Sequence, residues 1–185
     1  MMKMNEKKGR TRGLSSRFHA IALVVIVAAA AGLLLRPGAP LPKGARADAL
    51  VIEKARHRLT LLRKGKVLKV YRIALGRNPA GAKRREGDGR TPEGRYRIDW
   101  RNAKSKYHLA LHISYPDKAD RARARKLGVS PGGAIMIHGL PNGLGWIGKL
   151  HRMVDWTNGC VAVTDREIEE LWRAVPNGTA VTIKP

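Results

Sequence analysis

Residues 157–175, TNGCVAVTDREIEELWRAV, lead from a turn through a short strand into a helix. Asn158-Gly159 is a dipeptide typical of tight turns, and the apolar run 161–163 that follows is typical of a strand. Thr164 and Glu167 have the spacing of a capping box, so a helix is expected to begin there. One face of that helix is apolar with helical spacing, which predicts packing against a core; its members are Ile168, Leu171, Trp172 and Val175.

The rest of the chain contains short apolar runs, at 50–54 and 58–62, and segments in which apolar and polar residues alternate, the pattern of half-buried strands. The expected strands are residues 50–54, 58–62, 67–75, 94–100, 109–113 and 134–138, with a last strand near 181–183. In the segment 94–100 the apolar face is expected to hold Tyr96, Ile98 and Trp100. A second, mostly solvated helix is expected over 117–127, and long loops over 79–94 and 139–157. The fold class is therefore β-dominated α+β, a single domain over residues 48–185 with one clear helix near its C-terminal end.

The N-terminal 47 residues have the character of an export signal. Residues 1–17 are basic, and residues 18–35 contain no Asp, Glu, Lys or Arg. Such a helix spans about 27 Å, close to the hydrocarbon thickness of a bilayer, and the basic flank predicts a cytoplasmic N-terminus. We expect residues 18–35 to form an uncleaved transmembrane anchor; the alternative is a signal peptide cleaved near Ala47. Residues 36–47 are then a flexible tether, and both alternatives export residues 48–185.

The 185 residues carry a net charge of +23, of which +8 lies in residues 1–47 and +15 in residues 48–185. A basic exported domain suits attraction to acidic wall polymers, so a non-catalytic wall-binding protein is one function class to consider. Nucleic acid is not expected as a partner, because the sequence has no helix-turn-helix, zinc-finger or RNP-like motif.

Cys160 is the only cysteine, and in an exported domain a single thiol is either incidental or kept for its reactivity. The turn before it and the strand after it place the thiol at a junction where a side chain can be exposed. The backbone N–H groups of Gly159 and Cys160 are candidate donors to an oxyanion. A thiol nucleophile also needs a base, and the best candidate is His138, which ends the strand 134–138 on the face opposite its apolar residues. A buried structural cysteine is the alternative at this point.

His138-Gly139 is followed, after a loop, by TNGCV at residues 157–161. This arrangement resembles the signature of the L,D-transpeptidase catalytic domain (YkuD type), in which His-Gly precedes Ser/Thr-x-Gly-Cys-Ile/Val. The resemblance covers about residues 48–185 and extends to Gly87-Asp88, TPEG at 91–94 and Tyr96. The stretches LHISYP at 111–116 and DWT at 155–157 look closest to the YafK-like murein subgroup of the family.

The resemblance implies a mixed β-sheet or sandwich fold and a cysteine acyl-transfer enzyme of the bacterial cell wall. Cys160 is then the nucleophile that forms a thioester with a peptidoglycan stem peptide at its diaminopimelate residue, and His138 is the proton acceptor and donor. The implied partners are stem peptides and, for the subgroup, a wall-linked lipoprotein; no metal or organic cofactor is implied. The implied location is the periplasm, with the domain held at the inner membrane by residues 18–35 or released by cleavage.

Ala162 departs from the family pattern, in which most members carry Arg two residues after the cysteine. A guanidinium holds anions through two parallel hydrogen bonds, and its absence makes water a serious alternative to an amine as the acyl acceptor. The resemblance therefore implies an L,D-transpeptidase or a hydrolytic variant, an amidase or L,D-carboxypeptidase, and the sequence leaves the two open.

Seven further residues are candidates for substrate binding, because they lie close to the two catalytic residues in sequence or on a polar strand face. They are Tyr107, His112, Gly139, Trp146, His151, Trp156 and Thr157. His108 is expected at the surface.

Three other enzyme classes fit less well. A sortase needs an Arg after its cysteine, whereas only Arg166 and Arg173 follow here, both in the expected helix. Papain-like hydrolases place the cysteine before the histidine, the reverse of the order here, although geometry rather than order decides. A zinc peptidase would draw on His108, His112, His138 and His151, but a His-Glu-x-x-His motif is absent.

Overall fold

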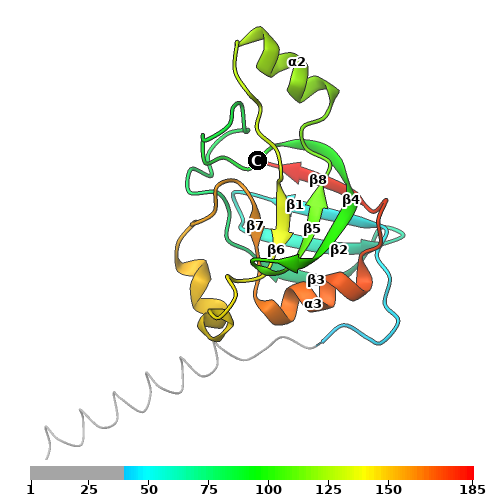
Figure 1. Cartoon of the computed structure of the whole chain (residues 1–185). Helices are drawn as coiled ribbons and strands as arrows, with labels where there is room; N and C mark the ends of the chain where they lie inside the picture. The colour runs from blue at the N-terminus through cyan, green and yellow to red at the C-terminus, as the bar shows by residue number, and fades with distance from the viewer. Residues whose placement is uncertain (1–39) are drawn as a thin grey trace, which may run out of the picture. The chain divides into compact units, whose positions relative to one another are not determined.

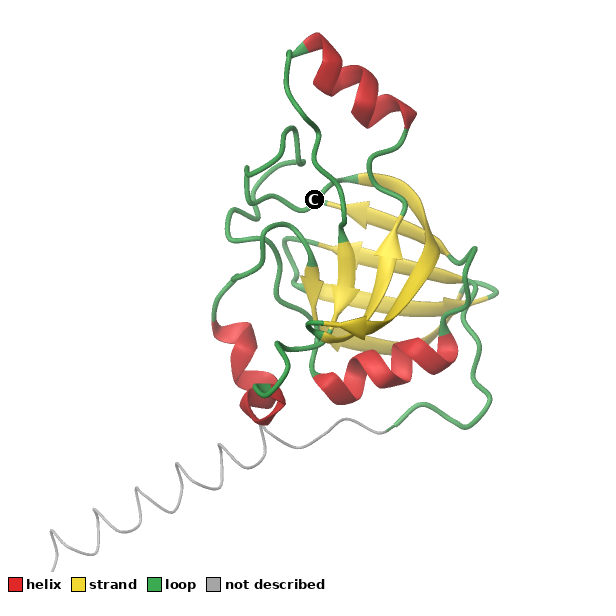
Figure 2. Ribbon diagram, viewed as in Figure 1, coloured by secondary structure: helices red, strands yellow, loops and turns green. Residues whose placement is uncertain are grey.

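Residues 40–185 are described by the computed structural model, and they fold around a strongly curled β-sheet (Figure 1 and Figure 2). The basic segment 1–17, the expected transmembrane segment 18–35 and the first residues of the expected tether lie outside this range. Within residues 40–185 no helix is both long and apolar enough to cross a membrane.

Eight strands in this part of the chain make up the sheet. They are β1 (Ala49–Glu53), β2 (Arg58–Arg63), β3 (Lys66–Arg72), β4 (Gly94–Ser105), β5 (His108–Ile113), β6 (Met136–His138), β7 (Val161–Ala162) and β8 (Ala180–Lys184). Their spatial order is β3-β2-β1-β8-β4-β5-β6-β7. β1 pairs with β8 and β6 with β7 in parallel, and the other neighbours are antiparallel. The β-dominated class and the mixed sheet expected from the sequence are thereby confirmed.

The two ends of this strand order come together just beyond β3. Ala74 and Ala162 of β7 exchange two backbone hydrogen bonds, of 3.0 and 2.8 Å. Slightly further along the chain, Gly76 bridges Thr157. The curl of the sheet therefore brings residues 74–77 beside the turn that precedes Cys160.

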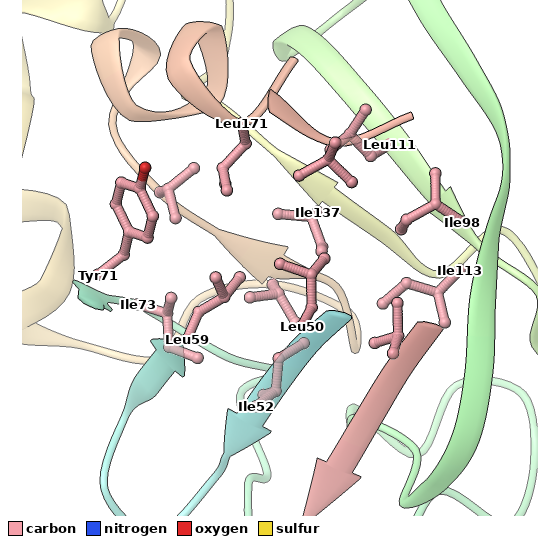
Figure 3. Close-up of a cluster of buried hydrophobic side chains, with 14 of the residues drawn as sticks. Leu50, Ile52, Leu59, Tyr71, Ile73, Ile98, Leu111, Ile113, Ile137 and Leu171 are labelled. Carbon is pink, nitrogen blue, oxygen red and sulfur yellow. The ribbon is translucent and has the colours of Figure 1, made fainter. Parts of the chain in front are cut away.

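Apolar side chains from both halves of the sheet and from one helix form the core (Figure 3). Leu50, Leu59, Ile98 and Ile137, from four different strands, have no exposed surface. Burying a side chain of this kind contributes about 1.5–3 kcal/mol. The core thus joins β6, the strand that ends in His138, to the rest of the sheet.

The helix expected from the capping box is α3, Asp165–Ala174. Thr164 is its N-cap: the hydroxyl accepts a hydrogen bond from the Glu167 N–H (3.3 Å), and the Glu167 carboxylate accepts one from the Thr164 N–H (3.0 Å). The expected apolar face is buried at Ile168, Leu171 and Val175 and half-buried at Trp172. Because α3 packs against β5 and β6, it supports the strand that ends in His138.

Two further helical segments lie outside the sheet. α2 (Lys118–Lys126) stands off from it at the top of Figure 1 and is mostly solvated, as the sequence predicts. η1, a 3₁₀ segment at Gly145–Met153, lies where only a loop was expected. It has no side-chain cap at its start, and Gly148 inside it has a φ of 52°, so the usual sequence signals of a helix are missing.

Trp100 is not on the core face that the alternation of residues 94–100 predicts. The pairing of β4 with β5 shifts its register between Ile98 and Arg101. Beyond this shift Trp100 is 43% exposed and stacks on His112, with 4.8 Å between ring centroids. An irregularity of this kind adds a residue to one strand and so exchanges its two faces, which the alternating pattern alone does not reveal.

Candidate active site

The candidate nucleophile and base come from neighbouring segments at β7 and β6. These strands pair in parallel, with Ile137 opposite Val161 and His138 opposite Ala162. Ile137 and Val161 are fully buried in the core. Successive side chains point to opposite faces of a sheet, so His138 and Cys160, one position away from these two, share the other face.

Thr157 holds the turn that leads into Cys160. Its hydroxyl donates to the Cys160 carbonyl (2.8 Å) and accepts from the N–H of Gly159 (3.1 Å). Gly159 has a φ of 126°, and a Cβ there would lie 2.5 Å from the carbonyl oxygen of Arg90, so only glycine fits. Of the two backbone donors expected to bind an oxyanion, the Gly159 N–H is therefore already engaged by Thr157 in this structure.

Gly76 lies where three backbone segments meet beside this turn. A Cβ there would lie 2.2 Å from the carbonyl oxygen of Gly89 and 2.9 Å from the Cα of Gly159. Because both neighbours are backbone atoms, we expect Gly76→Ala to lower the free energy of unfolding by roughly 2–3 kcal/mol, measured by chemical denaturation. Gly133→Ala is the control, since a Cβ there meets nothing within 4 Å. Equal losses in the two variants would contradict the close approach at Gly76.

His138 is buried, with 3% of its surface exposed. Its Nδ1 lies 2.6 Å from the carbonyl oxygen of Gly139. Because a carbonyl only accepts, Nδ1 carries the hydrogen and Nε2 keeps the free lone pair. Burial lowers the pKa of His138 below its ordinary value of 6.5, and the hydrogen bond to Gly139 opposes that shift. The imidazole is therefore neutral at neutral pH, in a tautomer that leaves Nε2 able to accept a proton.

Cys160 is half-buried, and its thiol donates to the carbonyl of Ala134 over 3.6 Å. Burial raises the pKa of the thiol above its ordinary value of 9.0, whereas a hydrogen bond from the Met136 backbone and the charge of Lys83 act in the opposite direction. Lys83 is itself buried and ion-paired with Asp88 at 2.9 Å. The resting thiol is therefore protonated, and it needs a base to become a nucleophile.

Cys160 and His138 line one cleft of about 440 Å³, a volume in the range of small-ligand sites. Three of the residues expected to bind substrate also line it: Tyr107, Trp156 and Thr157. The rings of Tyr107 and Trp156 lie 4.5 and 5.7 Å from that of His138, centroid to centroid. Two aromatic side chains thus pack around the imidazole and form part of the cleft wall.

Three other expected substrate-binding residues lie outside the cleft lining. The Nδ1 of His112 is 2.6 Å from a carboxylate oxygen of Asp99, and its ring is stacked on Trp100. Trp146 is 79% exposed on η1. Gly139 is needed for packing, because a Cβ there would lie 2.7 Å from the carboxylate of Asp165 at the start of α3.

His151, the seventh of these residues, is buried beside Trp156, whose indole N–H donates to His151 Nδ1 (3.4 Å). The Nε2 of His151 is buried and has no hydrogen-bond partner among residues 40–185. Burial, followed by the charge of Arg152, lowers the pKa of His151 to about 4. Its imidazole is therefore neutral in the folded protein at neutral pH.

This pKa predicts loss of stability in acid. Between pH 6.5 and about 4 the folded state binds fewer protons at His151 than the unfolded state, so the free energy of unfolding falls as the pH falls through this window. The loss is at most roughly 3 kcal/mol, and His138 adds to it in the same direction. Urea denaturation at several pH values measures this. His151→Leu is expected to flatten the curve, and a curve as steep as that of the wild type would contradict the assignment.

Several residues that line the cleft or act on the thiol are not expected from the sequence. Arg77, Lys106 and Asn158 line the cleft, and Lys83 influences the pKa of Cys160. Arg77, Lys106 and Lys83 do not stand out in the sequence, because it holds 37 Lys and Arg residues and these three lie in segments without a periodic pattern. The only signal was the place of Asn158 inside the TNGCV stretch.

Among residues 40–185 no group of three or more His, Cys, Asp or Glu side chains is arranged to hold a metal ion. Two of the histidines considered as zinc ligands are instead paired with separate acids, His108 with Glu169 and His112 with Asp99. In residues 40–185 the histidines considered for a zinc peptidase therefore do not form a metal site.

The fold and the cleft together define a class of protein, a curled β-sheet domain with a thiol and a buried imidazole on one sheet face in an open cleft. The chain belongs to the L,D-transpeptidase catalytic domain family (YkuD), whose family model matches residues 47–183. The resemblance noted from the His-Gly and Gly-Cys motifs is thereby confirmed.

Individual relatives agree with this membership. The chain is 30% identical over 112 residues to the putative L,D-transpeptidase YafK of Escherichia coli, a match that covers 59% of this chain and 37% of that protein. The fold is similar to that of the helical cell shape determining protein Pgp2 of Campylobacter jejuni (TM-score 0.57, 24% identity, 76% of this chain and 48% of that one). It is also similar to Bd1075 of Bdellovibrio bacteriovorus (TM-score 0.53, 24% identity, 77% and 49%). The chain thus spans less than half the length of these relatives.

Proposed function

We propose that the chain is a cysteine acyl-transfer enzyme that acts on peptidoglycan stem peptides through a thioester at Cys160. The observation that carries the proposal is the register between β6 and β7, which puts the only thiol of the chain and the buried His138 on one face of the sheet. Both side chains line the same cleft. Membership of the L,D-transpeptidase family supports the substrate class.

In the first step, Nε2 of His138 takes the proton of the Cys160 thiol, and the thiolate attacks the amide carbonyl at the diaminopimelate residue. The lowered pKa of His138 keeps the imidazole neutral and able to accept this proton. Its Nδ1–H, held by the carbonyl of Gly139, keeps the ring in place. The protonated imidazole then gives the proton to the leaving amine, and the acyl group stays on the sulfur as a thioester.

The oxyanion formed in this step needs backbone donors near Cys160. The N–H of Cys160 is the first candidate. The N–H of Gly159 is the second, and its hydrogen bond to Thr157 has to yield before it can turn to the oxyanion. The Thr157 side chain therefore affects whether the N–H of Gly159 is free to bind the oxyanion.

The thioester is resolved by an amine, which makes a cross-link or attaches a protein, or by water, which frees the stem peptide from Cys160. In the hydrolytic case a wall-linked lipoprotein would already have left in the first step, as the leaving amine. One observation keeps hydrolysis as the second candidate. Ala162 is fully buried and bonded through its backbone to Ala74. The position at which most family members carry Arg therefore offers this site no cation.

The N-terminal segments complete the proposal for the whole chain. Residues 1–17 are proposed as a cytoplasmic segment, 18–35 as an inner-membrane anchor or a cleaved signal, and 36–47 as a tether. The catalytic domain, residues 48–185, then works in the periplasm close to the wall, where its +15 charge is attracted to acidic polymers.

The test is to incubate the full chain with purified tetrapeptide muropeptides, with and without an amine acceptor, and to record products and intact protein by mass spectrometry. A mass increase on the protein and new cross-linked species support transfer to an amine. Products that are all shorter than the starting muropeptides support hydrolysis. If wall fragments bind and neither an adduct nor a product forms, the non-catalytic wall-binding alternative is favoured.

A further inference from the structure

The cleft that holds Cys160 is lined by two basic side chains, Arg77 and Lys106, and by no Asp or Glu. Asn102, Ser105 and Asn158 add neutral polar groups to the same wall. Because neighbouring charges of one sign raise the local concentration of the opposite one, a ligand of this cleft is expected to be negatively charged.

Arg77 is held at the cleft from three sides. Its backbone N–H donates to the carbonyl of Thr157 (2.9 Å), in the turn that leads to Cys160. Its side-chain stem lies close over the backbone of Gly89, where a Cβ would come within 2.9 Å of Arg77 Cγ. Its guanidinium donates to Oδ1 of Asn158 (2.5 Å). The side chain is exposed to solvent, and its two contacts restrict the guanidinium before a ligand binds, which lowers the conformational entropy lost on binding.

The guanidinium has donors left for a ligand. The bond to Asn158 uses one of its five N–H groups, and the fork geometry of the others matches a carboxylate. The chain segment that carries Arg77 is kept beside the turn by two bridges, Ala74 to Ala162 and Gly76 to Thr157. The segment 74–77 therefore contributes a cation to the cleft that holds the thiol, whereas Ala162 contributes none from β7.

We propose that Arg77, with Lys106 on the same cleft, forms an anion subsite that binds a substrate carboxylate next to Cys160. The subsite itself is independent of the reaction. Its assignment to a carboxylate of the stem peptide, at the diaminopimelate side chain or at the peptide terminus, rests on the proposed function.

The lone cysteine allows a direct test on the full chain, by comparing the alkylation rates of Cys160 by iodoacetate and iodoacetamide. The two reagents differ in charge, and a cation close to the thiol favours iodoacetate. Arg77→Gln is expected to lower the ratio of the two rates by about fivefold, the effect of a unit charge at about 4 Å in water. Arg77→Lys keeps the charge and is expected to keep most of the ratio.

Arg72→Gln is the matched control, because Arg72 is exposed on β3, outside the cleft lining, and its loss changes the net charge equally. The ratio of this variant is expected to equal that of the wild type. A wild-type ratio in Arg77→Gln, or an equal fall in Arg72→Gln, would overturn the subsite. Because each ratio is internal to one protein sample, a general change in thiol reactivity cancels.

A second measurement assigns the ligand. Tetrapeptides with a free carboxylate are compared with the same peptides amidated at one of the two carboxylates. Loss of a charge-assisted hydrogen bond is expected to cost the wild type about 10- to 100-fold in kcat/KM, and Arg77→Gln is expected to lose this discrimination. If neither protein turns over any peptide but the alkylation ratio still falls, the proposed function fails and the subsite stands. Discrimination that persists in Arg77→Gln would overturn the assignment to stem-peptide carboxylates.

Discussion

Cys160→Ala is expected to remove all covalent chemistry from the chain. Without a nucleophile no thioester forms, so turnover of muropeptides should fall by a factor of about 10,000 or more. Intact-mass measurement checks this directly. The wild type is expected to gain the mass of an acyl group from a muropeptide or from a carbapenem, and the variant is expected to stay at its own mass.

Stability measurements separate this loss from misfolding. Cys160 is half-buried, and its thiol donates to the carbonyl of Ala134 over 3.6 Å, a weak contact for a sulfur donor. We therefore expect the free energy of unfolding to change by less than about 1 kcal/mol in Cys160→Ala. Product formation that persisted in the folded variant would contradict the thioester. If cells that carry Cys160→Ala kept the wall phenotype of wild-type cells, the non-catalytic wall-binding alternative, which rests on the net charge, would be favoured.

Much of the fold follows from local patterns in the sequence. Short apolar runs located the segments that became β1 and β2, and period-two alternation located those that became β5 and β8. The Thr164–Glu167 capping box located the start of α3. These signals are strong because each one reflects a local requirement, a buried strand face or an uncapped helix end. The same patterns mark Cys160 and His138 as candidates, because Cys160 directly precedes one short strand and His138 ends another.

Other features depend on contacts between distant segments, and no local pattern encodes those. The irregular pairing of β4 with β5 turned Trp100 outward. Lys83 belongs to a basic run that looks solvated, yet it is buried because Asp88 folds back to pair with it. Arg77 reaches the cleft only because the sheet curls until residues 74–77 meet β7. The burial of Lys83 and the position of Arg77 beside the cleft are therefore results of tertiary structure.

The turn at Gly159 and Cys160, the candidate oxyanion site, shows a detail that the sequence does not reveal. The turn dipeptide and the following strand predicted that the N–H groups of Gly159 and Cys160 would both be free to face an anion. The hydroxyl of Thr157 instead accepts from Gly159 and donates to the Cys160 carbonyl. A side-chain-to-backbone bond of this kind is common for Thr in turns, but the sequence alone does not show which backbone group it engages.

His138→Gln is expected to have the second largest effect, a fall of about 100- to 10,000-fold in the rate of acyl transfer near neutral pH. Burial raises the pKa of the Cys160 thiol, so without a base the thiolate is scarce. The pH dependence distinguishes this cause from a structural one. At a pH above the raised pKa of the thiol, alkylation by iodoacetamide is expected to reach the same rate in the variant as in the wild type, because solvent then removes the proton.

The wild-type profile gives an independent check on the role of His138. Because burial lowers the pKa of His138, this base becomes protonated only at a pH below 6.5. The fall of kcat/KM on the acid side is therefore expected below that value. His108→Asn is the matched control: His108 is 37% exposed in its side chain, is paired with Glu169 and has a φ of 65°, which Asn tolerates. It should keep the wild-type rate and profile. An acid limb above pH 6.5, or an equal fall in rate in both variants, would contradict His138 as the proton acceptor, because that role requires a buried, neutral imidazole on the same sheet face as the thiol.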